Sequence, residues 1–252
     1  MSKKNIILKK KLKKLLNKLE IKKGSRILLH SNSAGFLQFI KTTKSFDTFF
    51  KILIKQIGRE GTLVVPTYNY NFTKGCAFDK SKSISQVGAF TNYLIKKYNQ
   101  NRTNDPIFSH LIFGKLYRKL NNCKNEEVFG RKSIFAHFEK YNFQIVCFCC
   151  PPNKMTFLHY IEKKTNVKYR FNKIFNGKIK IKNKYKVIKV KYYVGKRNIN
   201  YTIRGNNLLK LINKRKFREE SFGRFLCYTV RTKYLANIVR KKLSKNQYFL
   251  IK

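Results

Sequence analysis

The chain has 252 residues, of which 42% are hydrophobic, so it is long enough to bury a substantial core and too apolar to be intrinsically disordered. Its 58 Lys and Arg residues against 11 Asp and Glu residues give a formal net charge of +47, a balance that attracts nucleic acids and anionic membranes. Most of the basic residues are Lys spread over the whole length, and Asn, Ile, Phe and Tyr are also abundant. These residues share codons rich in A and T, so we interpret genome composition as the main source of the charge.

Two classes of protein are disfavoured by further features of the chain. No apolar run reaches the roughly twenty residues of a membrane helix, and the N-terminus lacks the apolar core of a signal peptide, so we expect a cytoplasmic protein. The six cysteines do not form a pair of C-x-x-C motifs, which argues against a metal site or a disulfide framework. We expect Cys147 and Cys149 on one face of a buried strand and Cys150 on the other.

The N-terminal segment predicts an amphipathic helix over residues 9–19, because its leucines recur at helical spacing. Packing of this apolar stripe onto a core is the favoured interpretation, and a membrane-surface helix is the alternative. The segment RILLHSNSAGF then predicts a short buried strand that runs into a loop. His30, Ser31 and Asn32 are therefore expected where this strand ends, either as a polar loop or at a ligand.

The next segments predict a helix from Ser45 to Gly58 and a buried strand GTLVVP over residues 61–66. A strand, a helix and a second strand with apolar interiors indicate a βαβ unit with a parallel sheet. After Pro66 the chain leaves the sheet, and its amide and aromatic groups suit an acceptor pocket as well as a plain surface loop. The residues concerned are Thr67, Tyr68, Asn69 and Tyr70.

The segment SQVGAFTNYLIKK predicts a helix that begins at Ser85, Gln86, Val87 and Gly88. A helix start with free N–H groups is suited to binding a phosphate, although an ordinary helix cap without a ligand has the same pattern.

The stretch TFLHYIEKKTNVKYR, from Thr156 to Arg170, holds the chemically most capable pair of side chains. A buried strand, FQIVCFCC, and two prolines precede it, so a helix that begins near Thr156 would lie at the carboxyl end of a strand. His159 and Glu162 are three residues apart and project from the same face of that helix. A neutral imidazole beside a carboxylate suits a general base with a helper, and a solvated ion pair is the structural alternative.

The last third contains no further motif. Residues 178–194 alternate between apolar residues and Lys and predict a β-hairpin with a turn at Asn183 and a bulge near Ile188. LLKLIN from Leu208 and the segment 228–243 are predicted as helices.

Several of these blocks together resemble the aminoglycoside 3-N-acetyltransferase family, the antibiotic N-acetyltransferases. The blocks are TFLHYIEKKTNVKYR, GREGTLVVPTYNYNF from Gly58 and SQVGAF from Ser85. The resemblance implies an α/β fold of three layers, α/β/α, with a largely parallel central sheet and a C-terminal antiparallel β-hairpin, distinct from the histone-acetyltransferase-like fold. It implies one domain over residues 1–252.

The resemblance also implies the roles of particular residues. His30, Ser31 and Asn32 would lie by coenzyme A, and the helix start with Ser85, Val87 and Gly88 would hold one of its phosphates. In the block NRTNDPIFSHLIFG, Arg102 and Ser109 match the cofactor-binding pattern. Asp105 and Phe108 stand where members that modify aminoglycosides usually carry histidines, so the chain looks closer to the branch that acylates amino sugars for surface polysaccharides.

These features lead to an expected function. The enzyme would transfer an acetyl group from acetyl-CoA to a primary amine of an amino sugar, either a nucleotide-linked sugar or an aminoglycoside, without a metal. His159 would be the catalytic base and Glu162 would align it. The acceptor would be bound by Thr67, Tyr68, Asn69 and Tyr70. Arg170 would hold a phosphate or carboxylate, or would be one of many basic surface residues. A homodimer is compatible with the sequence. The alternatives are a basic nucleic-acid-binding protein without enzymatic activity, although no zinc or helix-turn-helix pattern is present, and a family member that has lost its activity.

Overall fold

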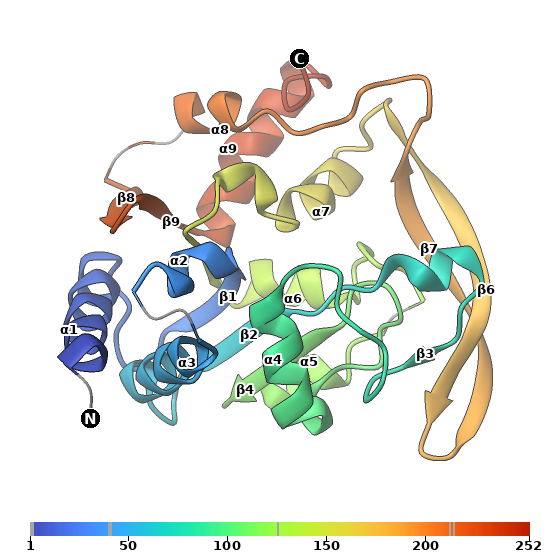
Figure 1. Ribbon diagram of the computed structural model, residues 1–252. Coiled ribbons are helices and arrows are strands. Elements are labelled where there is room, and N and C mark those ends of the chain that lie inside the picture. Colours follow the sequence, from blue (N-terminus) through green and yellow to red (C-terminus); the bar gives the residue numbers. More distant parts are fainter. Residues whose placement is uncertain (1–2, 40–41, 125, 212, 214) are drawn as a thin grey trace.

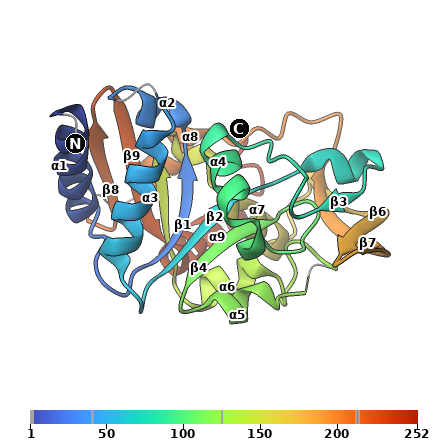
Figure 2. The same ribbon diagram turned by 60° about the horizontal axis from the view of Figure 1, so that its bottom comes forward.

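A computed structural model describes residues 3–39, 42–124, 126–211, 213 and 215–252. Its centre is a six-stranded mixed sheet with the strand order β4-β2-β1-β5-β9-β8, and helices lie on both sides of this sheet (Figures 1 and 2). The strands of this sheet are β1 (Arg26–Ser31), β2 (Thr62–Pro66), β4 (His110–Gly114), β5 (Gln144–Phe148), β8 (Phe217–Phe222) and β9 (Phe225–Arg231).

The described helices vary from single turns to four turns. The α-helices are α1 (Lys3–Lys18), α2 (Ser33–Leu37), α3 (Lys44–Ile57), α4 (Ala89–Tyr98), α5 (Tyr117–Asn121), α6 (Ile134–Lys140), α7 (Phe157–Lys164), α8 (Gly205–Leu211) and α9 (Thr232–Lys245). The short 3-10 helices are η1 (Tyr70–Lys74), η2 (Asn99–Asn101) and η3 (Pro152–Lys154).

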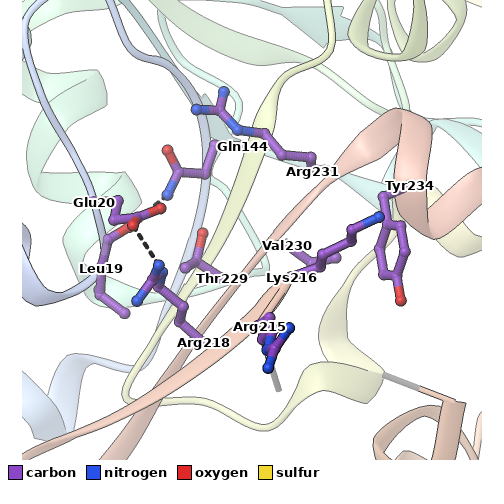
Figure 3. Close-up of a pocket in the computed structure, with 10 residues that line it drawn as sticks. All are labelled: Leu19, Glu20, Gln144, Arg215, Lys216, Arg218, Thr229, Val230, Arg231 and Tyr234. Atoms are coloured by element: carbon purple, nitrogen blue, oxygen red, sulfur yellow. Dashed lines mark hydrogen bonds and ion pairs between the residues drawn. The ribbon is translucent and has the colours of Figure 1, made fainter. Parts of the chain in front are cut away.

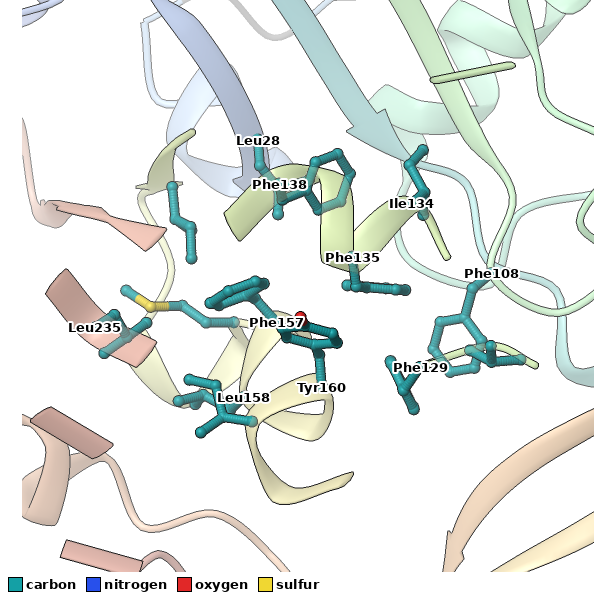
Figure 4. Close-up of a cluster of buried hydrophobic side chains, with 14 of the residues drawn as sticks. Leu28, Phe108, Phe129, Ile134, Phe135, Phe138, Phe157, Leu158, Tyr160 and Leu235 are labelled. Carbon is teal, nitrogen blue, oxygen red and sulfur yellow. The ribbon is translucent and has the colours of Figure 1, made fainter. Parts of the chain in front are cut away.

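The three central strands are buried on both faces because each carries apolar residues at consecutive positions. On one face, Leu28, Val64 and Ile145 contribute to an apolar cluster with helices α5 to α9. On the other face, Leu29 and Val65 contribute to a second cluster with helices α1 to α4. Figure 4 shows the first cluster, in which aromatic rings from α6 and α7 pack together.

The direction of the strands differs from the expected largely parallel sheet, and that prediction is wrong. Strand β1 is parallel to β2 and β5, whereas β2–β4, β5–β9 and β8–β9 are antiparallel pairs. A strand buried on both faces has the same apolar composition whichever way it runs. Its direction depends on the connections, such as the tight turn at Gly223 (φ 61°) that joins β8 to β9.

Helix α1 packs on the core. Its four leucines, Leu8, Leu12, Leu15 and Leu16, are buried in the cluster shared with α3, and so is Leu19, the residue that follows the helix. Burial of each such side chain contributes about 1.5–3 kcal/mol before entropy is subtracted. Among the described residues, no helix combines the length and apolar content needed to cross a membrane.

A long hairpin flanks the main sheet on the side of η1 (Figure 1). Strands β6 (Arg170–Ile181) and β7 (Lys184–Gly195) pair antiparallel, and β3 (Phe78–Asp79) joins β6 to form a three-stranded sheet. The register is unbroken from Arg170↔Gly195 to Ile181↔Lys184. The predicted bulge near Ile188 is therefore wrong. The change of phase in the sequence arises because Val187 is exposed and Val190 is buried, so these two residues lie on opposite faces of an unbroken strand.

Three further expectations are corrected. Helix α4 begins at Ala89 and not at Ser85, because Gly88 (φ 137°) has a backbone conformation that a helix does not accept. Residues 228–231 belong to strand β9, so α9 starts at Thr232 and not at Tyr228. Cys149 (φ 57°) breaks the strand alternation and lies in the opposite cluster from Cys147 and Cys150. The C-terminal part of LLKLIN includes residue 212, which lies outside the described residues.

Candidate functional site

A cavity of about 630 Å³ lies where β1, β2 and β5 end. The three strands are parallel, so their carboxyl ends meet on one edge of the sheet, which is the usual place for a ligand crevice. The lining combines strand ends, the segment before α4 and the start of α7. Its residues are Leu29, His30, Ser31, Asn32, Ser33, Pro66, Tyr68, Tyr70, Gln86, Val87, Gly88, Thr91, Cys150, Pro151, Asn153, Lys154, Thr156 and His159.

His159 projects from the first turn of α7 into the cavity, and its side chain is 24% exposed. Its Nδ1 atom lies 2.6 Å from Oε2 of Glu162, whose side chain is fully buried. The hydrogen bond to Glu162 engages Nδ1, so Nε2 is the nitrogen left for a ligand in the cavity. This arrangement suits proton transfer at the cavity surface.

Two side chains from the start of the hairpin complete the surroundings of Glu162. The hydroxyl of Tyr169 donates a hydrogen bond to Oε1 of Glu162 at 2.7 Å. Nε of Arg170 lies 2.7 Å from Oε2 as an ion pair, without the alignment of a hydrogen bond. Arg170 is buried and does not line the cavity, so the structure places this predicted substrate-binding residue behind the His159–Glu162 pair.

The charge of Glu162 follows from these contacts. Burial raises the pKa of this carboxyl, but the charge and hydrogen bond of His159, the charge of Arg170 and the Tyr169 hydroxyl together lower it below its ordinary value. Glu162 is thus an ionised, buried acceptor. The phenol of Tyr169 stays protonated, because burial and the neighbouring carboxylate raise its pKa far above neutrality.

The loop after β1 contributes the predicted group His30, Ser31 and Asn32, and all three line the cavity. Asn32 is the N-cap of α2, and its side chain accepts a hydrogen bond from the N–H of Ala34. Burial lowers the pKa of His30 to about 4, so its imidazole is neutral at pH 7. Its Nε2 atom is buried and has no hydrogen-bond partner among the described residues.

Of the predicted residues before α4, Val87 and Gly88 line the cavity and Ser85 does not. The hydroxyl of Ser85 accepts hydrogen bonds from the N–H of Val87 and from Thr91. Ser85 therefore holds the segment in place from behind.

The four residues after β2 alternate in their placement. Tyr68 and Tyr70 line the cavity, whereas Thr67 and Asn69 are buried. The Thr67 side chain is hydrogen-bonded to the side chains of Ser109 and Arg102, and the Asn69 side chain to neighbouring backbone. The hydroxyl of Tyr68 lies 3.3 Å from Nε2 of His110. Burial raises the pKa of Tyr70 to about 12.

Arg102 and Ser109 form a separate buried network and do not line the cavity. The guanidinium of Arg102 donates to the carbonyl oxygens of Thr67, Lys80 and Ser83, and its Nε donates to the hydroxyl of Ser109. Arg102 thereby ties the backbone after β2 to the segment before α4, and both segments reach the cavity wall.

Several cavity residues were not singled out from the sequence. Thr91, Asn153 and Lys154 line it because the fold brings them there, and nothing in their spacing indicated a ligand. The role of Tyr169 at Glu162 was also missed, since helix α7 ends at Lys164 and Tyr169 reaches Glu162 from the turn before β6.

A second, basic depression lies at the opposite end of the sheet, beside the start of β5 and the end of β9 (Figure 3). Arg215, Lys216, Arg218 and Arg231 line it together with Glu20, which pairs with Arg218. It contains no histidine or cysteine. Within the described ranges, no group of three or more His, Cys, Asp or Glu side chains is arranged to hold a metal ion.

The fold and the site define a class: a mixed α/β protein with an imidazole at the cavity and a buried carboxylate behind it. The family model for aminoglycoside 3-N-acetyltransferase matches residues 28–244. The chain belongs to this family and is therefore an acyltransferase of the aminoglycoside N-acetyltransferase type. Family membership contradicts the alternative hypothesis of a nucleic-acid-binding protein without enzymatic activity. No curated protein matches the chain in sequence.

Solved structures share the fold at low sequence identity. The apoenzyme of aminoglycoside acetyltransferase AAC(3)-IVa has a TM-score of 0.77 and 17% identity, with 97% of this chain and 91% of that chain covered. The YokD protein from Bacillus subtilis has a TM-score of 0.79 and 16% identity, with 95% and 94% covered. AAC-IIIb, described as a binary complex with CoASH, has a TM-score of 0.80 and 14% identity, with 94% and 96% covered.

Proposed function

We propose that this enzyme transfers an acetyl group from acetyl-CoA to a primary amine of an amino sugar, either nucleotide-linked or an aminoglycoside, and that residues 1–252 act as one domain. The observation that carries the proposal is the imidazole of His159 at the cavity, held by the buried carboxylate of Glu162 at 2.6 Å. The family and the CoASH complex of AAC-IIIb support the choice of acyl donor.

The cavity has properties that fit a coenzyme A thioester. Its volume of about 630 Å³ lies within the usual range of ligand sites, and Ser31, Asn32 and Ser33 offer hydroxyl and amide groups along one wall. Gly88 has no side chain to obstruct the approach of a ligand to the backbone beside Ser33. Acetyl-CoA, when bound, supplies an activated carbonyl carbon.

The chain's own residues then direct the proton. Glu162 fixes the proton of the His159 ring on Nδ1, which leaves Nε2 to accept a proton from the acceptor nitrogen as that nitrogen attacks the carbonyl carbon. The new C–N bond forms as the C–S bond breaks, and the imidazolium returns its proton to the leaving thiolate. Proximity and proton transfer suffice for this direct transfer, and no covalent enzyme intermediate or metal is required.

The proposal is tested by measuring the thiol released from acetyl-CoA with amino-sugar acceptors. His159→Ala should lower kcat/KM by at least about a hundredfold, because positioned acid–base catalysis supplies factors of that size. His137→Ala is the matched control, since His137 contacts Cys123 and does not line the cavity. Equal rates for wild type and His159→Ala would refute the assignment of the base.

A further inference from the structure

The carboxylates of this chain are few, and none of them lines the cavity. All 11 Asp and Glu residues lie within the described part of the chain. Eight take part in ion pairs with Lys, Arg or His; these are Glu20, Asp47, Glu60, Asp79, Glu127, Glu139, Glu162 and Glu220. None of the eight lines the cavity that contains His159.

The other three carboxylates do not reach the cavity either. Asp105 is buried and accepts hydrogen bonds from the N–H groups of Ile107 and Phe108. Glu126 is exposed, and its carbonyl oxygen accepts a hydrogen bond from the N–H of Lys191 in the hairpin. Glu219 is exposed on β8 beside Tyr228.

The cavity lining itself carries no negative charge among the described residues. Its one permanently charged side chain is Lys154, while His30 is kept neutral at pH 7 by its burial. The remaining polar groups are hydroxyls, amides and phenols, which bind neutral or anionic groups without a charge penalty. The net charge of +47 of the whole chain adds a positive field.

We infer that the acceptor of this enzyme is an amine that carries a negatively charged group, such as the phosphate of a sugar phosphate or of a nucleotide-linked sugar, and is not a polycation. This inference rests on the proposed acetyl transfer. A substrate with several ammonium groups would lose water at each of them and gain no carboxylate in return, inside a positive field. An acceptor with a phosphate and one amine meets Lys154 at the cavity lining, and it brings its amine to His159.

The decisive experiment compares acceptors that differ in charge, at saturating acetyl-CoA so that the cofactor region is filled. Glucosamine 6-phosphate and glucosamine form a matched pair, and kanamycin is the polycation. We expect kcat/KM for the phosphorylated sugar to exceed both others by about tenfold or more, the scale on which a charged cleft concentrates a substrate. The advantage should shrink as salt is raised from about 0.01 to 0.5 M, because salt screens charges at a cavity mouth.

A variant that adds one carboxylate to the wall should change this preference. Gln86→Glu keeps the side-chain oxygen that accepts a hydrogen bond from the N–H of Tyr70, and it places a negative charge in the cavity lining. The ratio of kcat/KM for the phosphorylated over the unphosphorylated sugar should fall by about threefold or more, a modest charge–charge effect at a partly solvated site. Gln247→Glu is the matched control: its oxygen accepts from the N–H of Lys168, outside the cavity lining, and the ratio should not change.

The results separate failure of the inference from failure of the proposed function. If kanamycin is acetylated at least as well as glucosamine 6-phosphate and the activity is lost in His159→Ala, the transfer stands and the anionic acceptor is refuted. If no acceptor is turned over, equilibrium binding to the coenzyme A complex of His159→Ala decides the inference: binding of glucosamine 6-phosphate but not of kanamycin supports it. Equal or tighter binding of kanamycin refutes it.

Discussion

Glu162 illustrates how single side chains build the site. A fully buried carboxylate is costly unless other groups neutralise and hydrogen-bond it, and here His159, Tyr169 and Arg170 do so within 2.6–2.7 Å. Arg170 therefore acts on the base through Glu162. Its positive charge balances the carboxylate that holds the imidazole.

Arg170→Gln should lower the free energy of unfolding by about 3–5 kcal/mol and lower kcat/KM, because it removes a cation that lies 2.7 Å from the fully buried carboxylate of Glu162. Arg170→Lys keeps the charge and should lose less of both. Urea unfolding and the rate of thiol release check this; unchanged stability and rate in Arg170→Gln would contradict the role given to Arg170.

At the scale of elements, η1 contributes to the wall of the site and the hairpin packs against η1. Tyr70, the first residue of η1, lines the cavity, and Phe72 of η1 lies against Gly177 of β6. A Cβ atom at Gly177 would meet the Phe72 ring at 2.6 Å, which is closer than real contacts allow. Glycine at this position lets the hairpin approach η1.

Gly177→Ala should lower the free energy of unfolding by about 1–3 kcal/mol, the usual cost of overpacking. It should also raise the KM for the acceptor, because a displaced η1 moves Tyr70. Urea unfolding of Gly177→Ala, Phe72→Leu and the double variant checks the cause. The double variant should lose less stability than the sum of the two single variants by at least about 0.5 kcal/mol, and strict additivity would contradict the proposed clash.

At the scale of the whole molecule, burial of histidines in the interior couples stability to pH. His110 lies between Tyr68 and the aromatic rings of Phe135 and Phe138. Burial, with a contribution from the charge of His30, lowers the pKa of His110 to about 3. In the unfolded chain His110 binds a proton near pH 6.5, whereas in the native chain it stays neutral. The free energy of unfolding therefore falls as the pH drops below 6.5.

Between pH 6.5 and 5, His110 alone should cost about 1.6 kcal/mol of unfolding free energy, since the slope rises from half of about 1.4 kcal/mol per pH unit at pH 6.5 to its full value near pH 5. His110→Gln removes this contribution and keeps a polar group near the Tyr68 hydroxyl. Its unfolding free energy should therefore fall by about 1.6 kcal/mol less than that of wild type over the same range. Burial raises the pKa of Asp105 to about 6, so its effect on stability between pH 6.5 and 5 has the opposite sign to that of His110. Asp105 and His30 are present in both proteins. Parallel curves would contradict the prediction.

The sequence by itself determined the local structure and the reactive pair. Apolar runs and helical spacing are properties of neighbouring residues, so they predicted the strands at Leu28 and Val64, the buried leucines of α1 and the shared helix face of His159 and Glu162. The tertiary structure decided what depends on residues far apart in the chain. It set the directions of β4 and β9, enclosed Arg102 in a network of backbone carbonyls and brought Tyr169 and Arg170 onto Glu162. It also excluded every carboxylate from the cavity lining, because strand connections and packing, which leave no periodic signal in the sequence, fix which loops meet at the edge of the sheet.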